Sequence, residues 1–275
     1  MVIADSCAEY ADILFGNSSA YSGSALLLGA LFFTIQIYGD FSGYSDIAIG
    51  TARLFGFQLM RNFAYPYFSA NMAEFWRRWH ISLSSWFRDY VYIPLGGSRG
   101  SRWELIRNVF IVFILSGLWH GANWTFLVWG LIHALLVIPL ILWNRNRQQI
   151  PKKEQASQNL VLEMASILLT FCITILTWVF FRAHNLEHAF QYLSGIFSAS
   201  LFSPPVFPGY RESTSTLVLC FLFFLIEWHG RKQQYAIEQL GNTWHKAARW
   251  SMYLILAVFI ILFYGNEQQF IYFQF

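Results

Sequence analysis

The chain has 275 residues, of which 56% are hydrophobic, 20% aromatic and only 12% charged. Soluble domains usually carry about a quarter charged residues, so this composition indicates a membrane protein. The net charge of +3 is small, and no Lys- and Arg-rich run interleaved with aromatic residues suggests nucleic-acid binding. Three cysteines lie far apart and predict neither a disulfide framework nor a zinc site. Cys172 and Cys220 fall within apolar runs, so we expect both in the core.

Residues 1–23 are mixed in polarity and predict an amphipathic or interfacial helix followed by a loop at 16–23. They lack the basic start and clean apolar stretch of a signal peptide, and they resemble the middle of a helical protein. An apolar run at 24–38 is short for a membrane span. It continues into the glycine-containing stretch GDFSGYSDIAIGTARLFGF.

Two carboxylates fall in this stretch, Asp40 and Asp46, with Tyr44 between them. Carboxylates at membrane depth usually face a bundle interior or a water-filled cavity, so we expect these three side chains to line an internal passage. The alternative is that the carboxylates cap helices that break at the neighbouring glycines.

Residues 61–107 are both basic and aromatic. They contain Arg61, Arg77, Arg78, Arg88, Arg99, Arg102 and Arg107, together with Trp76, Trp79, Trp86 and Trp103. Helices of this composition are expected to lie in the membrane interface with their basic groups at the lipid headgroups. By the positive-inside rule, the segment is expected on the cytoplasmic side.

His120 lies at the centre of the stretch LSGLWHGANWTFLVWG, between two apolar runs. The loop at 144–159 is basic as well, so the segment 109–143 is expected to enter the membrane and return to the same side. Its first limb is about half a span, which places His120 at membrane depth near a bend. An ionisable side chain is costly there, so His120 is a functional-site hypothesis. The alternatives are an interfacial anchor or a packing residue at a helix contact.

Residues 160–181 predict a full span, and 216–228 and 251–264 predict two more, joined by a basic loop. Between the first two spans, His184-Asn-Leu-Glu-His188 matches the H-x-x-E-H pattern of one zinc protease class. No third ligand is apparent, so we prefer a solvated helix face and expect no metal site.

Three stretches together resemble the membrane-bound O-acyltransferase family. They are YGDFSGYSDIAIGTARLFGF, NMAEFWRRWHISLSSWFRDYVYIPLGG and LSGLWHGANWTFLVWGLIHAL, and the C-terminal FIYFQF is also similar. The most similar branch is the bacterial type that O-acetylates alginate, with relatives that act on other exopolysaccharides and on peptidoglycan. The resemblance covers nearly the whole chain, but family members usually have several more membrane helices before it, so the chain resembles a C-terminal part.

The resemblance implies an all-α, multi-pass membrane domain that covers residues 1–275, with tilted and re-entrant helices around a central tunnel and interfacial amphipathic helices. It implies that His120 is catalytic and that His80, forty positions earlier, is the second polar residue of the site. The expected donor is acetyl-coenzyme A or an acyl-carrier thioester from the cytoplasm, with no tightly bound cofactor. The expected setting is the bacterial inner membrane, with lipids, a polysaccharide acceptor and membrane-anchored or periplasmic acetyltransferases as partners.

In this chemistry a neutral imidazole accepts the proton of a sugar hydroxyl as it attacks the acyl group, so His120 is predicted as the general base. Asn123, His80 or backbone amides are candidates for stabilising the oxyanion or orienting the site. Arg77 and Arg78 are candidates for binding donor phosphates, with lipid headgroups as the alternative. Two other functions remain open: a polymer or ion transporter that uses the same polar interior, and an inactive fragment.

Overall fold

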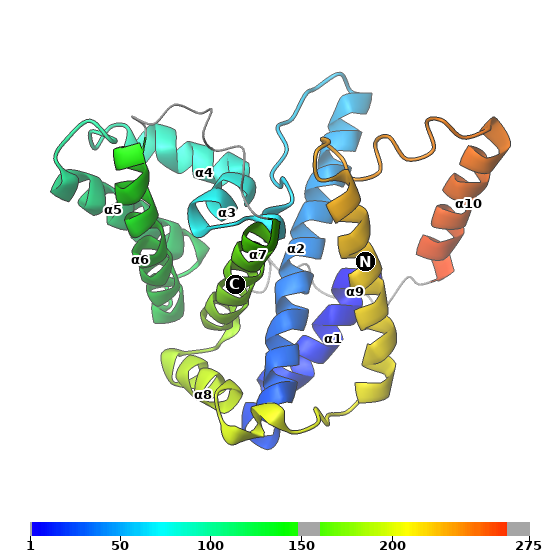
Figure 1. Cartoon of the computed structure of the whole chain (residues 1–275), viewed down its shortest axis with the longest axis horizontal. Helices are drawn as coiled ribbons and strands as arrows, with labels where there is room; N and C mark the ends of the chain where they lie inside the picture. Colours follow the sequence, from blue (N-terminus) through cyan, green and yellow to red (C-terminus); the bar gives the residue numbers. More distant parts are fainter. Residues whose placement is uncertain (1, 148–159, 263–275) are drawn as a thin grey trace. The chain divides into compact units, whose positions relative to one another are not determined.

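The computed structural model describes residues 2–147 and 160–262. Within these residues the chain is all-helical, which confirms the predicted class. The helices are α1 (Val2–Gly16), α2 (Gly23–Leu54), α3 (Met72–Arg78), α4 (Ile81–Phe87), α5 (Arg102–His120), α6 (Trp124–Arg147), α7 (Leu160–Arg182), α8 (Leu186–Ile196), α9 (Tyr210–Gly230) and α10 (Lys246–Leu262) (Figure 1).

Four helices in the described part of the chain are long and apolar enough to cross a membrane. They are α2, residues Trp124–Trp143 of α6, α7 and α9. The full span predicted at 160–181 is therefore confirmed, and the short span predicted at 216–228 is part of a longer helix. The last predicted span corresponds to α10, which has 17 residues and is not among the four. Most of the basic loop at 144–159 and the C-terminal FIYFQF lie outside the described residues.

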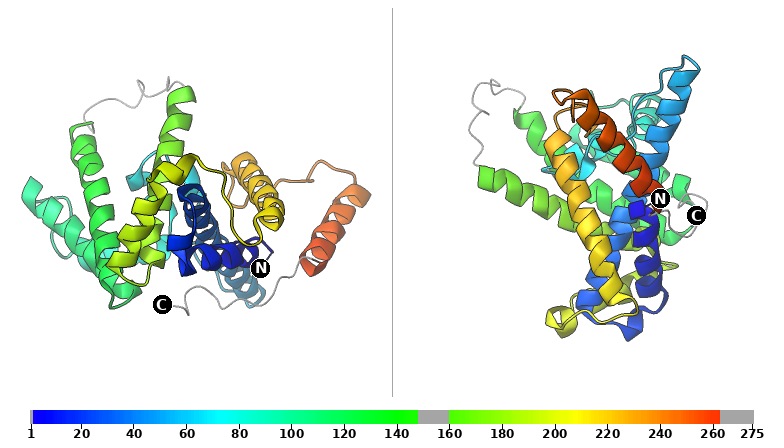
Figure 2. Two further views of the ribbon diagram at one scale, coloured as in Figure 1. Left: turned by 90° about the horizontal axis from the view of Figure 1, so that it is seen from below. Right: turned by 90° about the vertical axis from the view of Figure 1, so that its right-hand side faces the viewer.

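The chain divides into two compact units. Among the described residues, one contains 2–44 and 195–262, and the other contains 45–147 and 160–194. In the first unit α1 packs against α9, where the free thiols of Cys7 and Cys220 lie 3.6 Å apart. The hydroxyl of Tyr38 on α2 donates a 2.5 Å hydrogen bond to Glu227 on α9. Helix α10 buries no residue and stands apart from α9 (Figure 2).

Helix α2 runs without a break through 32 residues. The alternative that Asp40 and Asp46 cap broken helices is therefore wrong, because both lie inside one continuous helix. An unbroken helix provides hydrogen bonds for all of its internal backbone groups. Where water is absent, this gain outweighs the low helix propensity of glycine.

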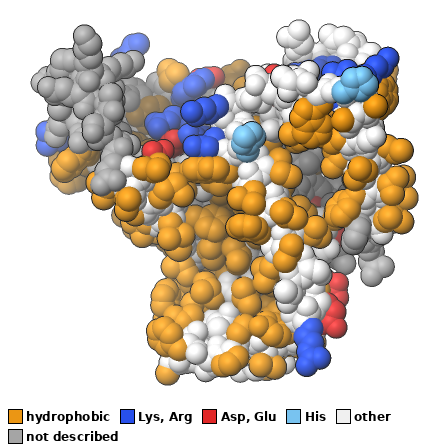
Figure 3. All heavy atoms as spheres, turned by 45° about the vertical axis from the view of Figure 1, so that its right-hand side comes forward, with side chains coloured by type: hydrophobic (Ala, Val, Ile, Leu, Met, Phe, Trp, Pro, Cys, Tyr) orange, Lys and Arg blue, Asp and Glu red, His pale blue; other side chains and the backbone are white. Residues whose placement is uncertain are grey.

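The predicted core position of Cys172 is also wrong. Cys220 is buried, but Cys172 is exposed on α7. In a membrane protein the outer face of a helix is as apolar as its inner face, so an apolar run alone does not tell which face is buried. Hydrophobic side chains cover most of the face drawn in Figure 3, as expected of helices that contact lipid.

The segment 61–107 differs in part from the prediction of interfacial helices. Trp86 and Trp103 are exposed, as expected, but Trp79 is only 2% exposed. Helix α3 packs against α6, and the indole of Trp79 lies 5.0 Å from that of Trp178 on α7. Tryptophan in a basic segment is therefore found in the core here as well as on the surface, and the interfacial location of the segment stays a prediction.

In the second unit α5 and α6 pack against each other as a hairpin (Figure 1). A capping box of Ser101 and Glu104 begins α5. At Gly117 an added Cβ would lie 2.4 Å from the carbonyl oxygen of Phe126, and at Gly130 it would lie 2.3 Å from that of Phe113. The two glycines thus let the helix backbones touch, and the bend predicted near His120 is confirmed.

We expect Gly130→Ala to destabilise the protein, because its methyl group would collide with the α5 backbone, which cannot rotate away. Overpacking of this kind costs about 1–3 kcal/mol. Thermal unfolding in detergent micelles should show a clearly lower midpoint than for the wild type. The matched control is Gly50→Ala on α2, where an added Cβ meets nothing within 4 Å. Equal midpoints for the two variants would contradict the close backbone contact.

Candidate active site

His120, the last residue of α5, lies in a cage of aromatic rings from three helices. Its ring centroid is 4.9 Å from that of Trp119 on α5, 5.4 Å from that of Trp129 and 6.3 Å from that of Phe126 on α6. On α7, the ring of Phe181 meets it edge-on at 4.9 Å. Apolar rings hold the imidazole in place and disfavour its charged form.

His80 approaches the same cage from the corner between α3 and α4. Its ring lies 6.0 Å from that of Trp119, whose ring is itself 4.9 Å from that of His120. His80 is only 8% exposed, and burial lowers its pKa to about 4. Trp119 is 53% exposed, so the side chain shared by both histidines faces the surroundings. The structure therefore brings the two predicted histidines to one aromatic group.

The backbone of His80 is left-handed, with φ 43° and ψ 56°. This conformation is uncommon for a residue other than glycine and persists only where the surroundings impose it. Here Asn62 imposes it: its carbonyl oxygen accepts from the N–H of Ile81 at 2.9 Å. Its side-chain oxygen accepts from both the N–H and the hydroxyl of Ser82. Asn62 was not anticipated, because a lone asparagine in a basic segment carries no distinguishing pattern.

Asn123 lies in the turn between α5 and α6. Its side-chain amide donates to the carbonyl oxygen of His184 at 2.9 Å, and its side-chain oxygen accepts from the N–H of Thr125 at 3.1 Å. It thus caps α6 and ties the turn after His120 to the end of α7. Its predicted contribution to oxyanion stabilisation or orientation stays a prediction.

The H-x-x-E-H stretch begins α8. The rings of His184 and His188 stack at 5.4 Å, and Nδ1 of His188 accepts from the N–H of His184. Asn185 accepts from the N–H of His188, and Glu187 accepts from Gln191. These contacts are those of a capped helix start. Among the described residues, no three His, Cys, Asp or Glu side chains gather as a metal site would require.

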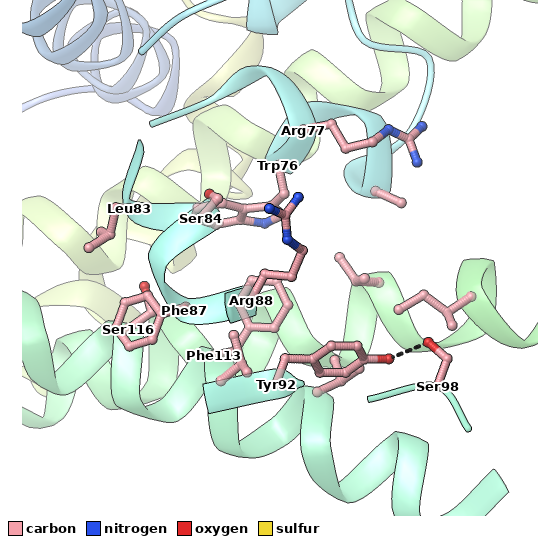
Figure 4. A pocket seen from close by; sticks show the side chains of 15 residues that line it. Trp76, Arg77, Leu83, Ser84, Phe87, Arg88, Tyr92, Ser98, Phe113 and Ser116 are labelled. Carbon is pink, nitrogen blue, oxygen red and sulfur yellow. Dashed lines mark hydrogen bonds between the residues drawn. The ribbon is translucent and has the colours of Figure 1, made fainter. Parts of the chain in front are cut away.

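A pocket of about 420 Å³ lies between α3, α4, α5 and α6 (Figure 4). Ser84, one helical turn after His80, lines it, and so does Ser116, one turn before His120. The lining of the pocket therefore includes one residue that is a single helical turn from each histidine along the chain. Most of its other lining residues are apolar.

The predicted anion-binding arginines separate in the structure. Arg77 lines the pocket, whereas Arg78 forms a 2.5 Å ion pair with Glu74 and is not among the lining residues. Arg88 also lines the pocket and pairs with Asp89 at 2.8 Å. The sequence marked Arg88 only as one of many basic residues, because its place at the pocket depends on how the segment after α4 folds.

The three residues predicted to line a passage all lie on α2. Asp40 is half-buried, and Tyr44 and Asp46 are exposed. Asp40 and Tyr44 belong to one compact unit, and Asp46 belongs to the unit that holds the histidines. Their lining of a tunnel stays a prediction.

Comparison with known proteins gives several relatives. The chain is 46% identical over 196 residues to a probable alginate O-acetylase AlgI of Pseudomonas aeruginosa, which covers 71% of this chain and 36% of that protein. It is 40% identical over 246 residues to the Azotobacter vinelandii probable alginate O-acetylase AlgI, covering 89% of this chain and 47% of that protein. A peptidoglycan O-acetyltransferase of Helicobacter pylori is 33% identical over 293 aligned positions, covering 100% of this chain and 54% of that protein.

The chain thus spans between about a third and a half of the length of these relatives. Residues 17–183 match the family profile MBOAT, membrane-bound O-acyltransferase. This match contains both histidines, the aromatic cage around His120 and the pocket. The chain therefore belongs to the membrane-bound O-acyltransferase family.

Proposed function

We propose that this chain carries the acyl-transfer site of a membrane O-acetyltransferase that moves acetyl from a cytoplasmic thioester to a hydroxyl of an exported polysaccharide. The observation that carries the proposal is the pairing of His120 and His80 at one aromatic cage beside an apolar pocket. Relatives named as alginate O-acetylases and as a peptidoglycan O-acetyltransferase support an alginate-like or peptidoglycan-like acceptor.

The proposed step is a single acyl transfer. The acceptor hydroxyl oxygen attacks the thioester carbonyl carbon, the carbon–sulfur bond breaks, and the sulfur leaves as a thiolate. His120, neutral in its cage, takes the hydroxyl proton and returns it to the departing sulfur, which balances the step. General-base assistance of this kind typically contributes about 10²–10⁴-fold. His80, Asn123 or backbone amides near Gly121 are the proposed donors to the oxyanion.

The pocket is the proposed site for the donor. Its apolar walls suit an acyl group and its linker, and the guanidinium groups of Arg77 and Arg88 suit the phosphates of a coenzyme or carrier. Both arginines belong to the basic segment that the positive-inside rule assigns to the cytoplasm, where thioesters are made. The tunnel that would bring the acceptor from the other side, the bacterial inner-membrane location and the acetyltransferase partners are further parts of this proposal.

Replacing the base tests the mechanism. We expect His120→Ala to lower acetyl transfer at least about 100-fold, because the variant lacks the imidazole proposed to take the hydroxyl proton. Transfer of radiolabelled acetyl to polysaccharide in isolated membranes measures this, with protein amount and thermal midpoint checked in parallel. His184→Ala, at an exposed helix start, is the matched control and should transfer normally. Wild-type transfer by His120→Ala would remove the base hypothesis, and movement of unmodified polymer would favour transport instead.

His80 should make the stability of the protein fall at acid pH. Burial lowers its pKa from 6.5 to about 4, so between these values the unfolded chain binds a proton that the folded chain does not. Lowering the pH from about 7 to about 5 should therefore reduce the thermal midpoint of the wild type more than that of His80→Asn. Asparagine is the chosen replacement because it tolerates the left-handed backbone of this position.

The same variant should also show reduced acetyl transfer at neutral pH, since it lacks the imidazole beside the cage. Equal pH dependence of the two midpoints would show that His80 is not held neutral by burial. Unchanged transfer would remove His80 from the proposed site.

A further inference from the structure

His133 is a fully buried histidine on α6 with no part in the proposed acyl-transfer step. It is 0% exposed, and its Nδ1 accepts a hydrogen bond from the indole N–H of Trp76 at 3.2 Å. A neutral imidazole whose Nδ1 accepts carries its proton on Nε2. In the part of the chain that the structure describes, that Nε2 is buried and has no hydrogen-bond partner.

An unpartnered polar atom in a membrane-spanning helix costs free energy that an apolar residue of the same size would avoid. The contact that a leucine could not provide here is the acceptor for Trp76. What His133 supplies to the fold is therefore a fixed orientation of one indole.

Trp76 lines the pocket, whereas His133 is not among the lining residues. The indole of Trp76 meets the ring of Phe113, a second lining residue, edge-on at 5.3 Å. The ring of His133 stacks against that of Phe113 at 6.3 Å. In Figure 4 both Trp76 and Phe113 are seen among the lining side chains. His133 thus lies behind the wall of the pocket and contacts two of its aromatic members.

We propose that His133 is a positioning residue that holds Trp76 as a rigid wall of the pocket and thereby restricts the transferred acyl group to a short one. The inference rests on the proposed function, because it takes the pocket as the donor site. A tryptophan held by a hydrogen bond and by ring contacts cannot turn aside for a longer chain. Without its acceptor, the indole can change orientation, and the pocket can then accept a longer acyl chain.

The test compares His133→Leu with His133→Asn. Leucine is similar in size to histidine, but it is apolar and removes the acceptor. The side-chain oxygen of asparagine can instead take the place of Nδ1 as the acceptor. The donors are acetyl-coenzyme A and butyryl-coenzyme A, and the measured quantity is the ratio of their kcat/KM values. We expect His133→Leu to raise the butyryl-to-acetyl ratio several-fold and His133→Asn to keep the ratio of the wild type.

A second readout follows the indole directly. The indole N–H resonance of Trp76, assigned by its loss in Trp76→Phe, should shift in His133→Leu and stay near its original position in His133→Asn. In a Trp76→Phe background, His133→Leu should cause no further change in the acyl ratio, because the group it positions is gone. If His133→Leu does not accumulate, Trp76→Phe alone should raise the ratio, since it removes the same hydrogen bond and shortens the wall.

If the wild type is active and His133→Leu has the same acyl ratio, this inference is overturned and the proposed function stands. Where Trp76→Phe is used in place of His133→Leu, an unchanged ratio in that variant has the same meaning. An unshifted Trp76 resonance in His133→Leu overturns it as well. A wild type that transfers neither acyl group overturns the proposed function, and the selectivity claim falls with it.

Discussion

The contact on which the site depends is the approach of two helix backbones at Gly117 and Gly130. A methyl group at either position would lie within 2.4 Å of a carbonyl oxygen of the facing helix. Helices in membranes gain little from hydrophobic attraction to one another, so they associate where small residues let them pack closely. Because α5 and α6 touch, the rings of Phe126 and Trp129 reach the last residue of α5, His120.

Around this hairpin, aromatic rings from several helices form one connected cluster. Trp129 stacks on Trp178 at 5.7 Å and meets Trp76 edge-on at 5.6 Å, and the rings of His120 and His133 both contact Trp129. Large rings carry much apolar area with few rotatable bonds, so a site made of them loses little entropy when it becomes ordered. The apolar rings also lower the local polarity, which strengthens electrostatic interactions close to them. The same cluster therefore links the imidazole of the proposed base to the wall of the proposed donor pocket.

Backbone strain is concentrated next to this cluster. His80 keeps a left-handed backbone because Asn62 holds the first residues of α4 by several hydrogen bonds. Such a conformation costs on the order of 1 kcal/mol or more and needs compensation from its surroundings. The arrangement turns the imidazole of His80 toward Trp119 at the end of α5. Asn62 and the first residues of α4 thus position His80, which lies outside the long apolar helices.

The sequence by itself determined the class of the protein, its main helices and its family. Low charge and long apolar runs identified a membrane protein, the span at α7 was found almost to the residue, and the bend after His120 followed from two basic segments on either side of it. These features are local: hydropathy, length and charge can be read from neighbouring residues. The two histidines were named from the resemblance of their motifs.

Only the tertiary structure decided which residues meet. It joined His80 to His120 through Trp119, although forty positions separate them, and it turned Arg77 to the pocket while it paired Arg78 with Glu74. It also made α2 continuous and showed which apolar residues face outward. Periodicity cannot settle such matters, because in a membrane both faces of a helix are apolar and contacts between distant segments depend on how their side chains pack.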